Sequence, residues 1–191
     1  MPKTRRLKLS AGHSVTIMEN NRPIAKQPDR GVIVGTHVEG DLNNRVLSLV
    51  SLQLIYWGVP YTKDPKENVL SDSIAFFRKI IEPQDIAIEI HFNSGGGNGT
   101  EVIIPANPSK YERKWGEIMS ATIAETLQIR DRGVKCEKTL GRRLGWMRIP
   151  CENFLPEICF LDNPENMKQY NIYKTSLPIR LAKLFRQMKE D

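Results

Sequence analysis

The segment from residue 86 to residue 92 limits most strongly what this chain can fold into. Apolar residues fill it except at Glu89 and His91, which predicts a buried strand. The segment ends at Phe92 and Asn93, and a loop containing the glycines 95–97 follows. A polar residue at the end of such a strand is typical of the crevice at the open edge of an α/β sheet. His91 is therefore a candidate for chemistry.

Strands and helices alternate along the whole chain. Apolar patterns predict strands over residues 7–10, 32–35, 59–62, 86–92, 101–104 and 154–161. Helical spacing, capping residues and glycine or proline stops predict helices over 41–57, 71–81, 109–127, from 163 onward and over 177–188. The stretch 130–153 is predicted to be a long loop over the sheet edge. This order predicts an α/β fold, with a twisted, mostly parallel or mixed sheet of about six strands and about five helices.

Length and composition predict one domain over residues 1–191. A chain of 191 residues can bury about 70% of the surface that it exposes when unfolded. Its three cysteines form no paired spacing, which favours a reduced protein made in the cytoplasm over a disulfide framework. The basic N-terminus is followed by no apolar signal segment, and no stretch of about 18 apolar residues predicts a membrane span.

The net charge of +6 predicts a surface that attracts polyanions such as nucleic acid, anionic lipid or a cell-wall polymer. The net charge alone does not distinguish among these classes of partner. A local excess of arginine and lysine lies between residues 130 and 143, but few aromatic residues accompany it. A solvated basic face is the simpler interpretation.

Histidine and carboxylate side chains occur where predicted strands end. His13 and His37 each follow a predicted strand, His91 lies near the end of one, and Glu39 precedes a predicted helix. Zinc hydrolases use three nitrogen and oxygen ligands and leave a fourth position open. The side chains of His13, Glu39 and His91 fit that set, while His37 could replace His13 or orient Glu39. The alternatives are hydrogen-bonded structural histidines and a glutamate that is favoured electrostatically at a helix N-terminus.

Two further glutamates interrupt apolar strands. Glu157 lies within the predicted strand 154–161 and needs a partner if it is buried, either in an ion pair with Arg148 or as a general base beside a metal. Glu89 precedes His91 by two residues and shares its sheet face, so it could hydrogen-bond that ring. The three tryptophans are predicted to be packing residues, and Trp146 is the best candidate among them for a sugar platform.

Four motifs then occur in a diagnostic order. They are Ser10-Ala11-Gly12-His13, Glu39-Gly40-Asp41-Leu42-Asn43, Ile88-Glu89-Ile90-His91-Phe92-Asn93 with Gly99-Thr100-Glu101-Val102, and the segment from Leu155 to Glu165. Together the motifs span nearly the whole chain, and it resembles the zinc-dependent N-acetylmuramoyl-L-alanine amidases of the amidase 3 type. The resemblance implies that His13, Glu39 and His91 bind Zn²⁺ and that Glu157 is the catalytic glutamate.

The resemblance also implies an activity and a setting. The enzyme would hydrolyse the amide between N-acetylmuramic acid and the L-alanine of the stem peptide in peptidoglycan. We expect a monomer with no nucleic-acid partner. An enzyme of this type without an export signal suits a phage endolysin, made in the cytoplasm and lysing cells after it is released to the wall. The alternatives are a zinc carboxypeptidase-like peptidase, which needs an arginine clamp for a free carboxylate, and a non-catalytic basic module that binds cell-wall polymer or nucleic acid.

Overall fold

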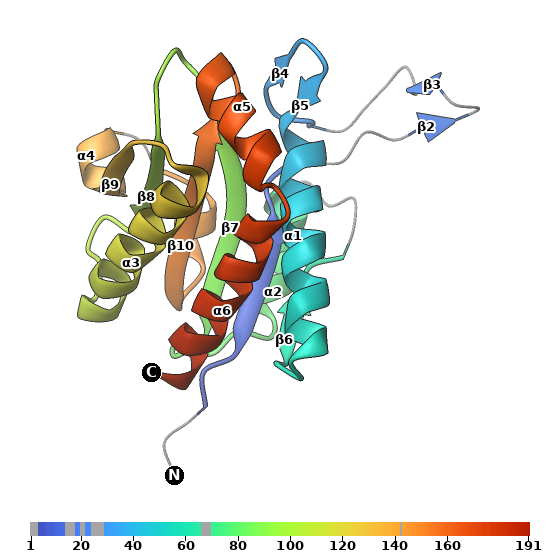
Figure 1. Ribbon diagram of the computed structural model, residues 1–191. Coiled ribbons are helices and arrows are strands. Elements are labelled where there is room, and N and C mark those ends of the chain that lie inside the picture. The colour runs from blue at the N-terminus through green and yellow to red at the C-terminus, as the bar shows by residue number, and fades with distance from the viewer. Residues whose placement is uncertain (1–3, 14–17, 20–21, 24–28, 66–69, 142) are drawn as a thin grey trace.

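A six-stranded mixed sheet forms the centre of the computed structural model, which describes residues 4–13, 18–19, 22–23, 29–65, 70–141 and 143–191 (Figure 1). The strands, in spatial order, are β6 (Tyr61–Lys63), β1 (Leu7–Ala11), β7 (Ile86–Asn93), β10 (Glu152–Phe160), β8 (Thr100–Ile104) and β9 (Asp131–Cys136). The first four run parallel, β8 is antiparallel to β10, and β9 is parallel to β8. Two short pairs, β2 (Met18–Glu19) with β3 (Arg22–Pro23) and β4 (Ile33–Val34) with β5 (His37–Val38), lie outside this sheet.

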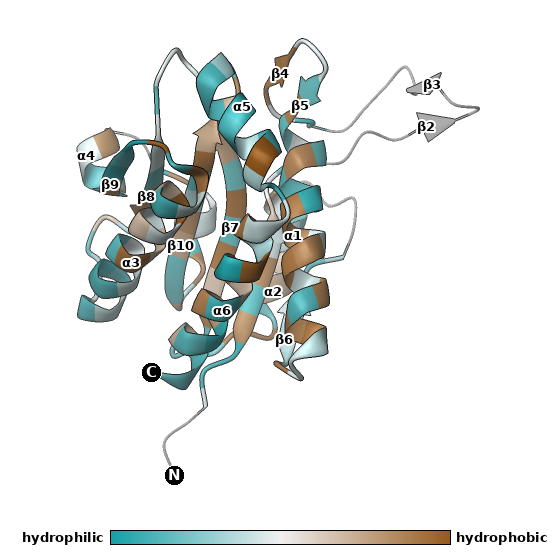
Figure 2. Ribbon diagram, viewed as in Figure 1, coloured by the Kyte–Doolittle hydropathy of each residue, from teal (hydrophilic) through white to brown (hydrophobic). Residues whose placement is uncertain are grey.

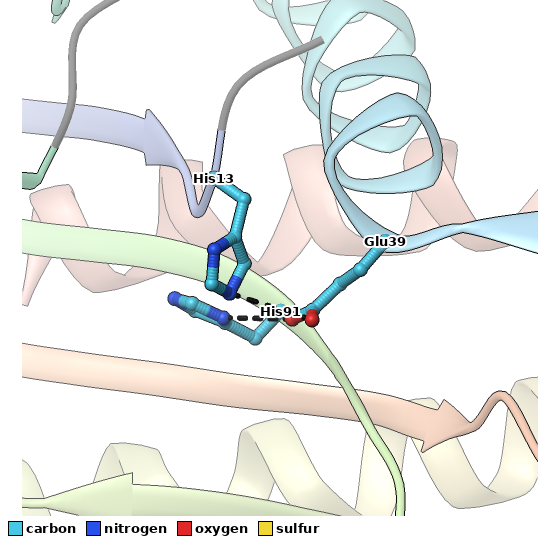
Figure 3. A group of neighbouring side chains, drawn as sticks. All are labelled: His13, Glu39 and His91. Atoms are coloured by element: carbon cyan, nitrogen blue, oxygen red, sulfur yellow. Dashed lines mark hydrogen bonds and ion pairs between the residues drawn. The ribbon is translucent and has the colours of Figure 1, made fainter. Parts of the chain in front are cut away.

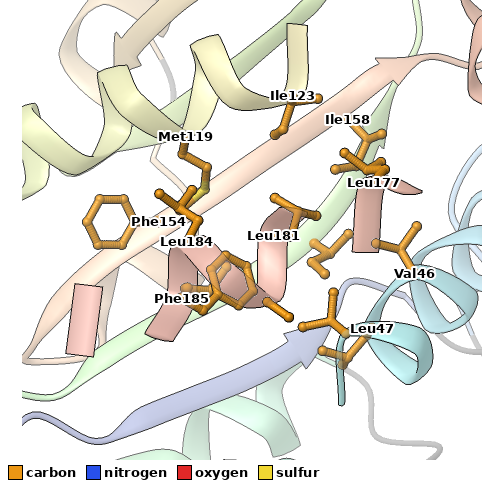
Figure 4. Close-up of a cluster of buried hydrophobic side chains, with 14 of the residues drawn as sticks. Val46, Leu47, Met119, Ile123, Phe154, Ile158, Leu177, Leu181, Leu184 and Phe185 are labelled. Carbon is orange, nitrogen blue, oxygen red and sulfur yellow. The ribbon is translucent and has the colours of Figure 1, made fainter. Parts of the chain in front are cut away.

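Helices cover both faces of the sheet. On one face lie α1 (Glu39–Tyr56), α3 (Lys110–Leu127), α5 (Pro164–Tyr173) and α6 (Ser176–Glu190), which share the larger apolar cluster with the strands. Figure 4 shows side chains of α1, α3 and α6 meeting those of β10 in that cluster. The other face is covered by α2 (Leu70–Arg78) and the 3₁₀ helix Trp146–Arg148, and the short α4 (Glu137–Leu140) follows β9. None of the described helices has the length and apolar character that crossing a membrane requires.

Strand alternation gives the sheet one mainly apolar face and one mixed face. Ile86, Ile88, Ile90 and Phe92 of β7 belong to the larger cluster, whereas Ala87 belongs to the smaller cluster beneath α2. Since successive side chains of a strand point to opposite faces, residues 89, 91 and 93 share the face of Ala87. By the same rule, residues 101 of β8 and 157 of β10 share that face with their neighbours 103 and 155, which also belong to the smaller cluster. The mixed face therefore collects the polar side chains of three adjacent strands.

The structure confirms the predicted α/β fold and corrects two of its segments. The strand predicted at 32–35 is present only as Ile33–Val34, which pairs with β5 and does not join the six-stranded sheet. Gly31 and Gly35 flank this pair with φ of 69° and 56°, left-handed values that break an extended chain on both sides. The strand predicted at 59–62 begins instead at Tyr61, after Pro60, which has no N–H to donate to a ladder.

The prediction of a long loop at 130–153 is wrong. The stretch contains β9, α4 and the 3₁₀ helix. Among the strands of the described residues, β9 pairs only with β8 at the sheet edge, and its residues are exposed or half-buried. Figure 2 shows it mostly teal, whereas β7 and β10 carry long brown segments. An edge strand needs no apolar run, which is why the pattern missed it.

Candidate metal centre

His13 lies just beyond the end of β1, at the carboxyl edge of the sheet. The N–H of Gly12 donates to the carbonyl of Ile90 at 2.9 Å, so the chain keeps its place beside β7 for one residue after the strand. His13 then takes a φ of 64°, a left-handed conformation that costs a residue with a side chain on the order of 1–3 kcal/mol. Backbone strain of this kind occurs mainly where a side chain must be held in one place.

Glu39 is the first residue of α1 and is buried, with 3% of its surface exposed. Its backbone N–H donates to the carbonyl of Val32 at 3.0 Å, and its Oε2 accepts the N–H of Val32 at 3.0 Å. The helix therefore begins two residues before its predicted start and carries the glutamate at its positive end, where a carboxylate is favoured. This reciprocal pair fixes both the backbone and the carboxylate of Glu39.

Three potential ligand atoms meet at this edge of the sheet (Figure 3). His13 Nε2 lies 3.4 Å from Glu39 Oε2, and His91 Nδ1 lies 3.0 Å from Glu39 Oε1. The two imidazole rings stand nearly perpendicular, with centroids 5.1 Å apart. One ligand atom from each residue lies within 4.8 Å of the other two, close enough to share one metal ion. The structure thus brings together the three predicted ligands.

The charges in this group are strongly coupled. Burial disfavours ionisation of Glu39, but hydrogen bonds from His13 and His91 outweigh it and hold the pKa of the carboxyl well below its usual value. Burial likewise disfavours a charge on His91, yet Glu39 and Glu89 raise its pKa well above the usual value. The pKa of His13 is raised as well, since Glu39 overcomes the effect of burial there. Without a metal, the carboxylates thus favour protonated imidazoles.

A second carboxylate contacts the outer nitrogen of each imidazole. His91 Nε2 lies 3.1 Å from Glu89 Oε2, and His13 Nδ1 lies 3.0 Å from Asp29 Oδ2. The contact between Glu89 and His91 was predicted from their shared face on one strand. Asp29 was not predicted, because it is sixteen residues from His13 in the sequence and lies in no strand or helix. Its only local signal is a turn, in which Oδ1 accepts the N–H of Gly31 at 3.0 Å.

Two glycines leave the space that this group occupies. A Cβ atom on Gly12 would lie 2.1 Å from His91 Nε2, and one on Gly31 would lie 2.5 Å from Glu39 Oε2. Both distances are far below van der Waals contact. Any larger residue at position 12 would therefore displace the ring of His91, and any at position 31 would displace the carboxylate of Glu39.

Glu157 lies on the strand next to His91. The two residues are register partners between β10 and β7, and Glu157 is buried, with 7% of its surface exposed. Its negative charge contributes to the raised pKa of His91. Both residues line one cavity of about 430 Å³, whose other described walls include Leu70, Leu144 and Leu155. The predicted catalytic glutamate thus shares a cavity with the three candidate ligands.

The remaining predicted candidates do not belong to this group. His37 lies in the β4–β5 pair and is not part of the ligand group found among the described residues. Trp146 borders the cavity but is fully buried, and its ring packs edge-on against Phe77 at 5.7 Å. A ring without exposed surface packs the core of the mixed face and is not available to stack on a sugar.

Solved structures similar to this chain share its fold. Cwp6 from Clostridium difficile is 16% identical with a TM-score of 0.77, and the match covers 98% of this chain and 30% of Cwp6. The N-acetylmuramoyl-L-alanine amidase from Clostridium difficile 630 is 18% identical with a TM-score of 0.70, covering 97% of this chain and 95% of that one. The catalytic domain of the CD27L endolysin targeting Clostridia difficile is 19% identical with a TM-score of 0.66, covering 97% and 96%.

Comparison with sequence families is more specific than these structural matches. No curated protein matches it. A family model, Amidase_3, described as N-acetylmuramoyl-L-alanine amidase, matches residues 11–177. The matched segment includes His13, Glu39, His91 and Glu157.

Proposed function

The chain belongs to the Amidase_3 family of N-acetylmuramoyl-L-alanine amidases, and from this premise we propose that it is a zinc enzyme with Glu157 as its general base. Its reaction is hydrolysis of the amide between N-acetylmuramic acid and the L-alanine of the peptidoglycan stem peptide. Within this proposal, His13, Glu39 and His91 hold the metal.

The observation that carries the proposal is the convergence of two imidazole nitrogens and one carboxylate oxygen within 4.8 Å. This donor set suits zinc, which binds histidine nitrogen and carboxylate oxygen and keeps one position open in catalytic sites. The outer nitrogens of both rings contact carboxylates, an arrangement common around zinc-binding histidines. The residues present therefore fit this ion.

The chemistry divides between the metal and the chain. A zinc ion bound here would polarise the scissile carbonyl and lower the pKa of a bound water to about 7. Glu157, on the strand beside His91, would accept the proton of the attacking water and pass it to the departing amine of L-alanine. Glu157 is already close to the candidate ligand His91, because β10 and β7 are hydrogen-bonded neighbours in the sheet.

The cavity would hold the scissile bond between a polar end and an apolar wall. His13, Glu39, His91 and Glu157 form the polar end, and leucines at 70, 144 and 155 form part of the wall. Apolar side chains keep water away from the charged groups and thereby strengthen electrostatic stabilisation of the transition state. The only water needed at the reacting carbonyl is the nucleophile itself.

The family match favours an amidase over both alternatives, a zinc carboxypeptidase and a non-catalytic binding module. A carboxypeptidase would need an arginine to clamp the free carboxylate of its substrate. Among the described residues that line the cavity there is no arginine. Origin from a phage and synthesis in the cytoplasm remain predictions.

Mass spectrometry of digested peptidoglycan tests the reaction. Purified cell walls treated with the enzyme should release intact stem peptides that begin with L-alanine, and a chelator should stop their release until zinc is added back. Release of single amino acids from the carboxyl end would instead identify a carboxypeptidase. Equal activity in the presence and absence of the chelator would remove the metal from the proposal.

A further inference from the structure

We propose that Glu89 is a positioning residue that fixes which nitrogen of His91 faces the metal centre. The inference rests on the proposed function, because it concerns the metal that His13, Glu39 and His91 would hold. It assigns a role to a residue outside the ligand set and outside the general base.

The two ring nitrogens of His91 have different partners. Nδ1 lies 3.0 Å from Glu39 Oε1, on the side of the ligand group, and Nε2 lies 3.1 Å from Glu89 Oε2. A carboxylate oxygen accepts hydrogen bonds and cannot donate when it is ionised. A metal ion bound to Nδ1 would replace the proton that this nitrogen shares with Glu39, and Glu89 would then hold the one remaining ring proton on Nε2.

The position of Glu89 suits this role because its backbone lies in the middle of the sheet. Strand β7 is hydrogen-bonded to β1 on one side and to β10 on the other, and Glu89 is the register partner of Ser10 in β1. Only 3% of its surface is exposed. A carboxylate held this firmly fixes the orientation of the ring as well as its tautomer.

Asp29 provides a comparison within the same site. It contacts the outer nitrogen of His13 at nearly the same distance, but 68% of its side chain is exposed. Water can replace an exposed acceptor and screens its charge. Loss of the Glu89 carboxylate should therefore weaken metal binding much more than loss of the Asp29 carboxylate.

Zinc affinity, measured by competition with a chelating dye, tests the inference without using enzyme activity. Glu89→Ala should weaken zinc binding by about 10- to 100-fold. Glu89→Gln should recover part of that loss, because its amide oxygen can still accept from Nε2. Asp29→Asn should lose less than about fivefold. Glu117→Gln, which makes the same charge change on the exposed face of α3, is the matched control and should bind zinc like the unmodified protein.

A spectroscopic measurement separates orientation from general destabilisation. In the zinc-loaded protein, long-range ¹H–¹⁵N NMR should find Nδ1 of His91 bound to metal and Nε2 protonated. Glu89→Ala should lose this single pattern, and Glu89→Gln, which keeps the size of the side chain, should retain it. Circular dichroism verifies that both variants are folded.

The outcomes distinguish this inference from the proposed function. If the unmodified protein binds no zinc, both are overturned. If it binds zinc through His13, Glu39 and His91 but the Glu89 variants match it in affinity and in the His91 spectrum, only the role of Glu89 is overturned. Binding of zinc through Nε2 of His91 would also overturn it.

Discussion

Replacing Gly12 with alanine should disable the proposed metal centre while leaving the fold intact. Gly12 follows β1 directly and does not have a positive φ, so an alanine there meets no backbone strain. Its Cβ atom, however, would lie 2.1 Å from Nε2 and 2.2 Å from Cε1 of His91. The added methyl group would therefore displace mainly the ring of His91.

The magnitude follows from these distances. The ring must retreat by roughly 1.3 Å to restore an ordinary contact of 3.4 Å. Zinc–nitrogen bonds tolerate displacements of only about 0.2 Å, and a misplacement of about 1 Å in a catalytic site costs on the order of 100-fold in rate. We expect kcat/KM to fall about 100-fold, equivalent to about 2.7 kcal/mol, and zinc affinity to fall with it.

Release of stem peptides from purified cell walls gives kcat/KM, and dye competition gives the zinc affinity. Gly116→Ala is the matched control, because Gly116 lies in α3, where its Cβ would meet side-chain atoms of Val134 and Ile104 rather than the site. The control should keep both values. If Gly12→Ala binds zinc as tightly as the unmodified protein and turns over at the same rate, the ring of His91 does not lie against Gly12 as the structure places it.

Three further predictions test the role of Glu157, the binding of zinc and the buried carboxylate of Asp64. Glu157→Gln should lower kcat by about 10²- to 10⁴-fold in a protein that still binds zinc, and full activity of this variant in the wall-digestion assay would exclude Glu157 from the mechanism. Free zinc at about 100 times its Kd should raise the melting temperature by about 5–10 °C, reversed by chelator; a calorimetric scan without any shift would argue against the site. Burial raises the pKa of Asp64, so the folded state binds a proton at this carboxyl more tightly than the unfolded state does. The contribution of Asp64 to the free energy of unfolding therefore falls as pH rises above about 4. In Asp64→Asn the side-chain amide oxygen can still accept hydrogen bonds from Ser10 and Ser73. Urea unfolding of the metal-free protein should show that this variant gains stability relative to the unmodified protein as pH rises from about 4 to 7. A difference in the free energy of unfolding that does not change with pH would contradict this.

The elements that the sequence predicted well are those whose local pattern and burial agree. Strand β7 is apolar at every position that faces the larger cluster, and α3 begins with a capping box at Ser109 and Glu112. Such signals are local, so they can be detected without knowing the tertiary structure. Strand β9 fails this condition, because its pairing with β8 depends on two segments that meet only in the folded sheet.

The residues of the candidate site likewise fall into those that could be predicted from the sequence and those that could not. His13 and His91 follow from chain order, because parallel strands bring their carboxyl ends to one edge, and Glu39 was predicted from its position just before a helix. Asp29 and Gly31 could not be predicted in this way. Their positions beside His13 and Glu39 are set by backbone turns and by the pairing of Gly40 N–H with the carbonyl of Arg30 at 3.0 Å. Contacts of this kind leave no periodic pattern in a sequence.

The buried charges explain why this edge of the sheet suits a divalent cation. Glu39, Glu89 and Glu157 lie in or beside one cavity, and each exposes 7% of its surface or less. Buried carboxylates are costly without cations nearby. Without metal, His13 and His91 can supply two positive charges, since the carboxylates raise the pKa of both rings. A divalent ion bound to two neutral imidazoles supplies the same two charges at nearly the same place. Exchange of two protons for one such ion therefore leaves the net charge of the site unchanged, whereas a monovalent ion would leave it one positive charge short.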